Sequence, residues 1–165
     1  MVRFVLTAFL FTGAFGLSTP LSATPASKGA QWASAPVVTK LSQQRPKVRD
    51  VANTRFGYAM ATGDFNGDGQ LDLAVGVPRQ PHGNQEASGR VVIFSGQKGS
   101  GLRSNRFKNI DRSQLGGVVS GDEEFGRALA AGDFNGDGFD DLAISAPYAM
   151  DASRKRAGVV YVIYG

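Results

Sequence analysis

Two stretches of identical sequence carry the side chains best suited to binding a metal ion. Residues 63–69 and residues 132–138 both read Gly-Asp-Phe-Asn-Gly-Asp-Gly. Each is followed by an acid, Asp72 or Asp141, so that carboxylate or amide oxygens recur at positions 1, 3, 5 and 9 of a glycine-rich loop. Ca²⁺ takes roughly six to eight oxygens and tolerates irregular geometry. The spacing therefore predicts a calcium loop.

The first copy alone could supply about six ligand oxygens, counting two from a bidentate acid at position 9. The expected ligands are Asp64, Asn66, Asp68, the backbone carbonyl of Gln70, and Asp72. Gly69 and Gly138 stand at loop position 6, where a tight turn around an ion tends to need the positive φ that glycine adopts without a Cβ clash. These glycines are expected to shape the loop and not to bind the ion.

The loop differs from an EF-hand, which places a bidentate Glu at position 12 between two helices. Position 12 here is Val75 or Ile144, inside the alternating runs 71–77 and 141–146 that indicate strands. The ion would thus lie in a strand–loop–strand turn. A plain hairpin is the alternative, because Asn-Gly and Asp-Gly favour hairpins and Asx side chains cap turns. A turn alone, however, does not need the acid at position 9.

The N-terminal segment predicts export. A short basic start precedes an apolar run over residues 4–11 and then small residues, which is typical of a signal peptide over residues 1–23, cleaved after Gly16 or near Ala23. A membrane anchor is the alternative, but the run is shorter than the roughly 20 residues that span a bilayer. Residues 24–55 are basic and rich in Ser and Pro, which indicates a linker. We expect a secreted, extracellular protein that, having no cysteine, depends on packing or metal for stability.

Charge and composition argue against two other classes of function. The net charge is +4, but five of the basic residues lie within residues 24–50, before the first repeat, and no basic stripe with interleaved aromatics follows, so nucleic-acid binding is not expected. His82 is the only histidine and stands in a polar loop. No nucleophile–base pair or zinc cluster can be assembled around it, so we expect no enzyme activity.

The two loops belong to longer repeats. An offset of 69 residues carries Phe56-Gly57 onto Phe125-Gly126, Pro78 onto Pro147, and Gly96 onto Gly165. Such a period indicates one supersecondary unit per repeat, stacked on its neighbour. The expected units are residues 56–124, a repeat with a connector, and residues 125–165.

Each unit is predicted to be an all-β blade of four strands. Two strands flank the loop and a third covers residues 89–94 or 158–164, with apolar side chains on both faces, as in a sheet covered on both sides. In the first unit a fourth strand is expected between Ser113 and Ser120. Phe65 and Phe134 are predicted to turn inward and anchor the loops.

These residues resemble FG-GAP repeats, which are familiar from the β-propeller of integrin α subunits. The Gly-Ala-Pro corner of the repeat stands here as Gly76-Val77-Pro78 and Ser145-Ala146-Pro147, each differing at one place. The resemblance implies four-stranded propeller blades, Ca²⁺ in the loops, and a role in extracellular recognition or cell adhesion. It also implies the ligands of the second loop, namely Asp133, Asn135, Asp137, the carbonyl of Phe139, and Asp141. FG-GAP repeats also occur beside catalytic domains such as a phospholipase D, so an accessory propeller of a secreted hydrolase is the alternative function.

Two blades make an incomplete propeller. One face of each sheet can be buried against the other, but the remaining faces, with Val91 and Ile93 or their alternates, would meet water or another molecule. We therefore expect self-association or a protein partner at the open blade faces, unless residues 24–55 cover them.

Overall fold

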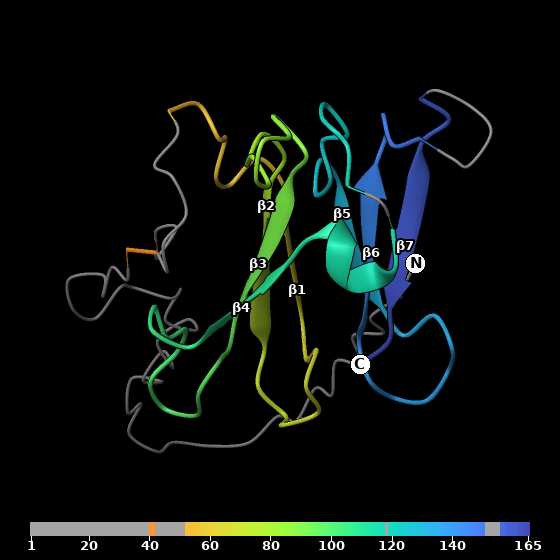
Figure 1. The fold of residues 1–165 in the computed structure, drawn as a ribbon. Coiled ribbons are helices and arrows are strands. Elements are labelled where there is room, and N and C mark those ends of the chain that lie inside the picture. The colour runs from red at the N-terminus through yellow and green to blue at the C-terminus, as the bar shows by residue number, and fades with distance from the viewer. Residues whose placement is uncertain (1–39, 42–51, 118, 151–155) are drawn as a thin grey trace, which may run out of the picture. The chain divides into compact units, whose positions relative to one another are not determined.

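The computed structural model describes residues 40–41, 52–117, 119–150 and 156–165. The predicted signal peptide and most of the predicted linker lie outside these ranges. The described residues form two antiparallel sheets (Figure 1), which confirms the all-β class and the blade-like organisation. No helix in the described ranges is long and apolar enough to cross a membrane.

Both sheets are meanders in which each strand pairs with the next one along the chain. The first sheet has the order β1-β2-β3-β4 and the second the order β5-β6-β7. The strands are β1 (Met60–Gly63), β2 (Asp72–Val77), β3 (Arg90–Phe94), β4 (Phe107–Ile110), β5 (Leu129–Gly132), β6 (Asp141–Ala146) and β7 (Val159–Ile163). The first unit thus has the four strands predicted for a blade, and the described part of the second unit has three.

The 69-residue offset of the sequence holds in the strand register. Gly63 pairs with Asp72, and Gly132 pairs with Asp141, so both loops close at the same position of their hairpins. Proline follows β2 and β6 directly and withholds an N–H, which ends both strands where the sequence predicts.

The fourth strand was predicted in the wrong place. β4 covers Phe107–Ile110, and the segment expected to be a strand contains the 3-10 helix η1 (Arg112–Leu115) instead. Asp111 caps this helix. Its carboxylate accepts a hydrogen bond from the Ser113 N–H, and the Asp111 N–H donates one to the side-chain oxygen of Gln114. This capping box, Asp-x-x-Gln, is a local signal that outweighs strand propensity.

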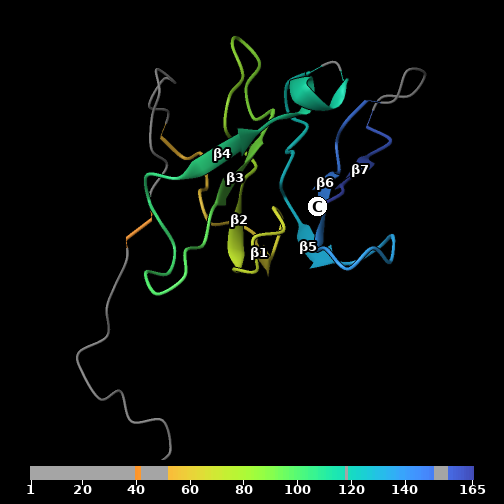
Figure 2. The same cartoon turned by 90° about the horizontal axis from the view of Figure 1, so that it is seen from below.

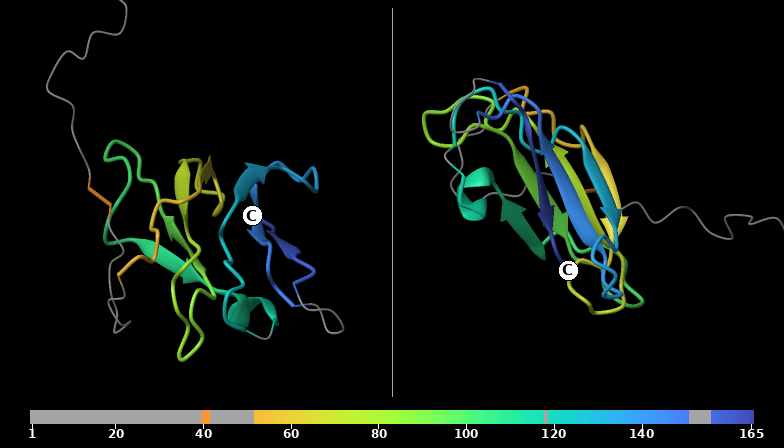
Figure 3. Two further views of the ribbon diagram at one scale, coloured as in Figure 1. Left: turned by 90° about the horizontal axis from the view of Figure 1, so that it is seen from above. Right: turned by 90° about the vertical axis from the view of Figure 1, so that its right-hand side faces the viewer.

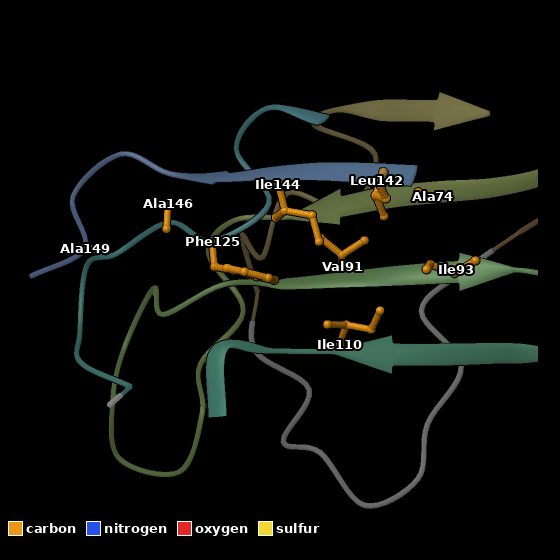
Figure 4. Close-up of a cluster of buried hydrophobic side chains, with 9 residues drawn as sticks. All are labelled: Ala74, Val91, Ile93, Ile110, Phe125, Leu142, Ile144, Ala146 and Ala149. Atoms are coloured by element: carbon orange, nitrogen blue, oxygen red, sulfur yellow. The ribbon is translucent and has the colours of Figure 1, made fainter. Parts of the chain in front are cut away.

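The two sheets share one core. Ala74, Val91 and Ile93 of the first sheet pack against Leu142 and Ile144 of the second, together with Phe125, the first residue of the second unit. Figure 4 shows Val91 and Ile144 pointing toward one another in this cluster. Strands β1 and β5 lie next to each other where the sheets meet (Figure 2).

Close backbone approach between the sheets depends on glycine. A Cβ at Gly76 would lie 2.1 Å from the carbonyl oxygen of Gly126, and one at Gly89 would lie 2.2 Å from the carbonyl oxygen of Phe125. Real side chains do not reach such distances, so these glycines let the Phe-Gly segment of the second unit lie directly on the first sheet.

The outward faces of the two sheets differ. On the first sheet Val75, Val92 and Phe94 form a second buried cluster, against which Leu41 and Phe56 pack. β3 is therefore buried on both faces, as predicted, and Leu41 of the predicted linker helps to cover it. On the second sheet β7 alternates between half-buried and exposed residues, so the expectation of two covered faces is wrong for this strand.

Candidate metal centre

The first loop is organised by hydrogen bonds from backbone N–H groups to its own acids. The Asp64 carboxylate accepts from the N–H groups of Asp68 (3.1 Å) and Gly69 (2.7 Å). The Asp68 carboxylate accepts from the N–H of Gln70 (2.9 Å), while the Asn66 amide donates to Asp72 (2.8 Å). All five predicted residues of this loop therefore lie in one turn, with Gly69 at a φ of 77° as expected for position 6.

The second loop repeats this arrangement. The Asp133 carboxylate accepts from the N–H groups of Gly136 (2.6 Å), Asp137 (3.1 Å) and Gly138 (2.9 Å). Asn135 donates to Asp137 (2.7 Å), and Asp137 accepts from the N–H of Phe139 (2.9 Å). The N–H donors, that of Gly138 above all, hold the pKa of Asp133 below its usual value.

The acid at position 9 connects each loop to the end of its sheet. Asp72 and Asp141 are the first residues of β2 and β6, and both are almost fully buried. Asp72 accepts from the N–H of Gly96 (2.8 Å), and Asp141 accepts from the N–H of Gly165 (3.1 Å). The sequence repeats a glycine at positions 96 and 165 but does not indicate its role. In the structure, the N–H groups of Gly96 and Gly165 donate to these two acids.

The position-9 acid of the first loop, Asp72, has a raised pKa. Burial raises the pKa of its carboxyl above the usual value, and the charges of Asp68 and Asp64 raise it further, against the lowering effect of the hydrogen bond from Gly96. The three carboxylates of the first loop are therefore close enough to repel one another.

The oxygen donors of each loop fit a hard cation, although in this structure the carboxylates accept hydrogen bonds from backbone N–H groups of the loop. Each loop offers three carboxylates, one side-chain amide oxygen and a backbone carbonyl, which are the oxygen ligands that Ca²⁺ takes. Within the described ranges, no group of three or more His, Cys, Asp or Glu side chains is gathered closely enough to hold a metal ion. Binding an ion would require these carboxylates to exchange backbone N–H partners for it.

No pattern in the sequence indicates that the two loops touch. The Asp140 carboxylate, at position 8 of the second loop, accepts a hydrogen bond from the N–H of Asp64 in the first loop (2.9 Å). The ring of Phe139 lies against Gly67, where an added Cβ would be 3.0 Å from it. These contacts join residues about 70 positions apart, which no local pattern can indicate.

The two loop phenylalanines have different surroundings. Phe65 packs against the core between the sheets, as predicted. Phe134 is 55% exposed, so its predicted inward anchoring is wrong. The physical reason is that Phe65 points toward the second sheet, whereas Phe134 lies beside Gly132 on the outward face of its own sheet.

His82 and Asp111 lie close to Ser113, but not in the order of a catalytic triad. Its Nδ1 lies 3.3 Å from the carboxylate of Asp111, whose other oxygen accepts from the Ser113 hydroxyl (2.5 Å). In a catalytic triad the histidine stands between the acid and the nucleophile, but here the acid stands between the other two. Asp111 serves as a helix cap, and His82 is a partly exposed neighbour.

A small pocket of about 170 Å³ adjoins the first loop between the two sheets. Ile93, Ile110 and Leu142 line it, with Asn66 and Asp140 on the side of the loops. Small-molecule sites usually measure about 300 Å³ or more. The pocket is therefore too small for most organic substrates.

Comparison with known proteins agrees with this architecture. Residues 56–94 and 125–163 match the FG-GAP repeat. The chain is 40% identical over 118 residues to the phosphatidylinositol-glycan-specific phospholipase D of Rattus norvegicus. It is 40% identical over 112 residues to integrin alpha-PS2 of Drosophila melanogaster, and 37% identical over 111 residues to integrin alpha-7 of Homo sapiens.

The aligned residues make up 70%, 66% and 67% of this chain, but only 14%, 7% and 8% of those three proteins. The chain thus spans a small part of the length of these relatives. Two FG-GAP repeats are present in this chain. The chain belongs to the FG-GAP repeat proteins.

Proposed function

We propose that the chain is a calcium-binding extracellular module that recognises a protein partner, as in cell adhesion. The observation that carries the proposal is that both units place the same oxygen donors in the same hairpin loop, and that the two loops touch. Asp64, Asn66, Asp68, the Gln70 carbonyl and Asp72 would hold one Ca²⁺. Asp133, Asn135, Asp137, the Phe139 carbonyl and Asp141 would hold a second. The bound ion would neutralise carboxylates that otherwise repel one another.

The opposite end of the sheets supports a role in protein recognition. There Arg127 lies over the rings of Tyr58 and Tyr148, at 5.9 and 5.5 Å from their centres. Arg55 also lies over the ring of Tyr58, at 5.7 Å from its centre, and Arg156 over that of Tyr148, at 5.8 Å. Arginine and tyrosine are enriched at the energetically dominant positions of protein interfaces, and here their side chains are held in place by stacking. The proposed metal would stiffen one end while this arginine–tyrosine row meets the partner at the other.

Titration of the calcium-free chain with Ca²⁺ in a calorimeter tests the metal site. We expect two binding events, and a melting temperature that falls when a chelator is added. Mg²⁺ serves as a control, because it demands closer octahedral geometry and should bind more weakly. Unchanged melting in chelator, together with no heat at millimolar Ca²⁺, would show that the loops are plain hairpins.

An accessory role in a secreted hydrolase is the second candidate, favoured by the identity to a phospholipase D. In that case the recognised partner would be a catalytic domain, and no reaction would take place on this chain. A catalytic domain encoded in the same reading frame would favour this candidate. Calcium-dependent attachment of cells to the immobilised chain would favour adhesion.

A further inference from the structure

The outward face of the second sheet is exposed and apolar. Val160 is 66% exposed and Val162 is 41% exposed on β7, and Phe134 is exposed next to Gly132 of β5. In the right-hand view of Figure 3 this sheet, in blue, lies in front of the first one. Exposed apolar surface of this kind on a soluble protein usually marks an interface.

The internal repeat indicates what kind of surface this is. Subtracting the offset of 69 residues carries Val160, Val162 and Phe134 onto Val91, Ile93 and Phe65. Those three residues pack into the core between the two sheets. The exposed face of the second sheet is therefore a copy of a face that another sheet covers in the same molecule.

A third blade cannot cover it in the same way. On the first sheet Gly76 lets the carbonyl oxygen of Gly126 approach to where a Cβ would be 2.1 Å away. The equivalent residue of the second sheet is Ser145, whose hydroxyl oxygen accepts a hydrogen bond from the N–H of Ala128 (2.8 Å). The serine side chain occupies the space that the backbone of a further Phe-Gly segment would need. A different packing geometry is required.

The other end of the two-sheet stack is covered. Val75, Val92 and Phe94 on the outward face of the first sheet are at most 2% exposed, beneath Leu41, Phe56 and Leu102. Copies of the chain therefore cannot add head to tail without displacing this cover. The open face can meet only another open face, which gives a closed, isologous contact.

The open face is complementary to itself. Its outward side chains are small on β5 and β6, where Ala130, Ala143 and Ser145 stand, and large on β7, where Val160 and Val162 stand. Phe134 adds one large side chain beside Gly132, at the loop end of β5. None of these residues is charged. A two-fold axis running along β6 would place the large side chains of β7 over the small ones of β5 in the partner, as packed sheets require.

We infer that two copies of the chain dimerise through the outward faces of their second sheets, around a two-fold axis along β6. This adds a second copy of the chain at a surface other than the arginine–tyrosine row of the proposed function, and it does not depend on the metal. It predicts that light scattering gives twice the monomer mass, both in Ca²⁺ and in chelator. A loss of calcium binding would thus overturn the proposed function and leave the dimer intact.

Charge on the open face should separate the copies. Val160→Lys is expected to give a monomer, because a lysine would be buried without a partner. Met60→Lys is the matched control: Met60 is 63% exposed on the first sheet, and its replacement should leave the dimer unchanged. A wild-type monomer that binds no hydrophobic dye would show that the chain itself covers the face, and would overturn the inference.

Cross-linking tests the geometry, since the chain contains no cysteine of its own. In the proposed dimer Ala143, on β6, faces its own counterpart across the axis. Ala143→Cys should therefore be joined to a dimer by a short bifunctional maleimide reagent, and Met60→Cys should not. Equal cross-linking of both variants, or of Met60→Cys alone, would contradict the proposed axis.

Discussion

The acid at loop position 9 has a structural task whether or not a metal is bound. Asp72 and Asp141 each accept the N–H at the end of their sheet with one carboxylate oxygen. A plain turn does not require this acid, but a turn tied to the end of the neighbouring strand, β3 or β7, does. Its presence in both repeats is therefore weaker support for calcium than the loop sequence alone implies. The acids at positions 1 and 5, which are not needed to tie the sheet, are the better test.

Replacing the position-5 acid should remove one site at a time. Asp68→Ala should abolish binding in the first loop and Asp137→Ala in the second, because each removes a carboxylate from a set of three. Calorimetry should then count one Ca²⁺ per chain in either variant.

Asp140→Ala is the matched control for these two variants. Like Asp137→Ala, it removes an acid of the second loop, but at position 8, which is not expected to bind metal. Two Ca²⁺ should therefore still bind. The first loop should bind Ca²⁺ roughly five-fold more weakly, because the variant loses the hydrogen bond that the Asp64 N–H donates to Asp140. A typical hydrogen bond contributes about 1 kcal/mol, which corresponds to this change in affinity. If all three variants lost binding equally, charge density and not loop geometry would hold the ion.

Residue spacing was enough to predict which side chains share a loop and which glycine turns it. The contact of Asp140 with the first loop could not be predicted, because it depends on how two units stack. The surroundings of Phe134 were mispredicted for a related reason. Phe65 and Phe134 occupy the same position of identical sequences, and only the neighbouring sheet distinguishes them.

At the scale of elements, the connector does more than join the two units. Arg112 on η1 donates to the buried carboxylate of Glu123, to the hydroxyl of Tyr161 on β7 (2.6 Å) and to the carbonyl of Met150 (3.0 Å). Glu123 also accepts from the N–H of Ser120 (3.0 Å). A buried ion pair is costly unless its polar atoms are satisfied. The bonds to Glu123 all end on its Oε1, and its Oε2 is buried without a hydrogen-bond partner. The bonds that are made fix the connector against the second sheet.

The contact between the sheets should be sensitive to a single methyl group. Gly76→Ala would place a Cβ against the carbonyl oxygen of Gly126, forcing the sheets apart, and overpacking of this kind costs about 1–3 kcal/mol. We expect a lower midpoint of urea unfolding with an unchanged slope.

Gly132→Ala is the matched control, because it adds the same methyl group to a strand where the nearest atom would be 3.7 Å away. It should leave the unfolding midpoint nearly unchanged. The loss of glycine flexibility in the unfolded chain would by itself raise stability in both variants. Equal loss in both would therefore mean that the contact between the sheets does not set the cost.

Alternating hydrophobicity and the two prolines located β2 and β6 from sequence. β4 was misplaced because the Asp-x-x-Gln cap of η1 was not recognised, and a short strand such as Phe107–Ile110 has only a weak pattern. The connector network could not be foreseen, since its partners Arg112, Glu123 and Tyr161 come together only after the sheets have stacked.

At the scale of the molecule, the two sheets are expected to unfold together. Their shared core joins Val91 and Ile93 to Leu142 and Ile144, and the loops add the contact between Asp64 and Asp140. Neither sheet would keep its buried face if the other unfolded. Residues 38–165 also form one compact unit by their contacts. A single cooperative transition follows from this arrangement.

Calcium should move that single transition as a whole. A ligand that binds only the folded state stabilises it by about 2.7 kcal/mol per site at 100 times its dissociation constant. Asp137→Ala should therefore lose about half of the calcium-dependent shift in melting temperature and still melt in one step, because the first loop stabilises both sheets through their common core. Calorimetric scans at several Ca²⁺ concentrations would measure this. Two transitions, only one of them moving with Ca²⁺, would show that each sheet is stabilised by its own loop and that the core between them does not couple the two.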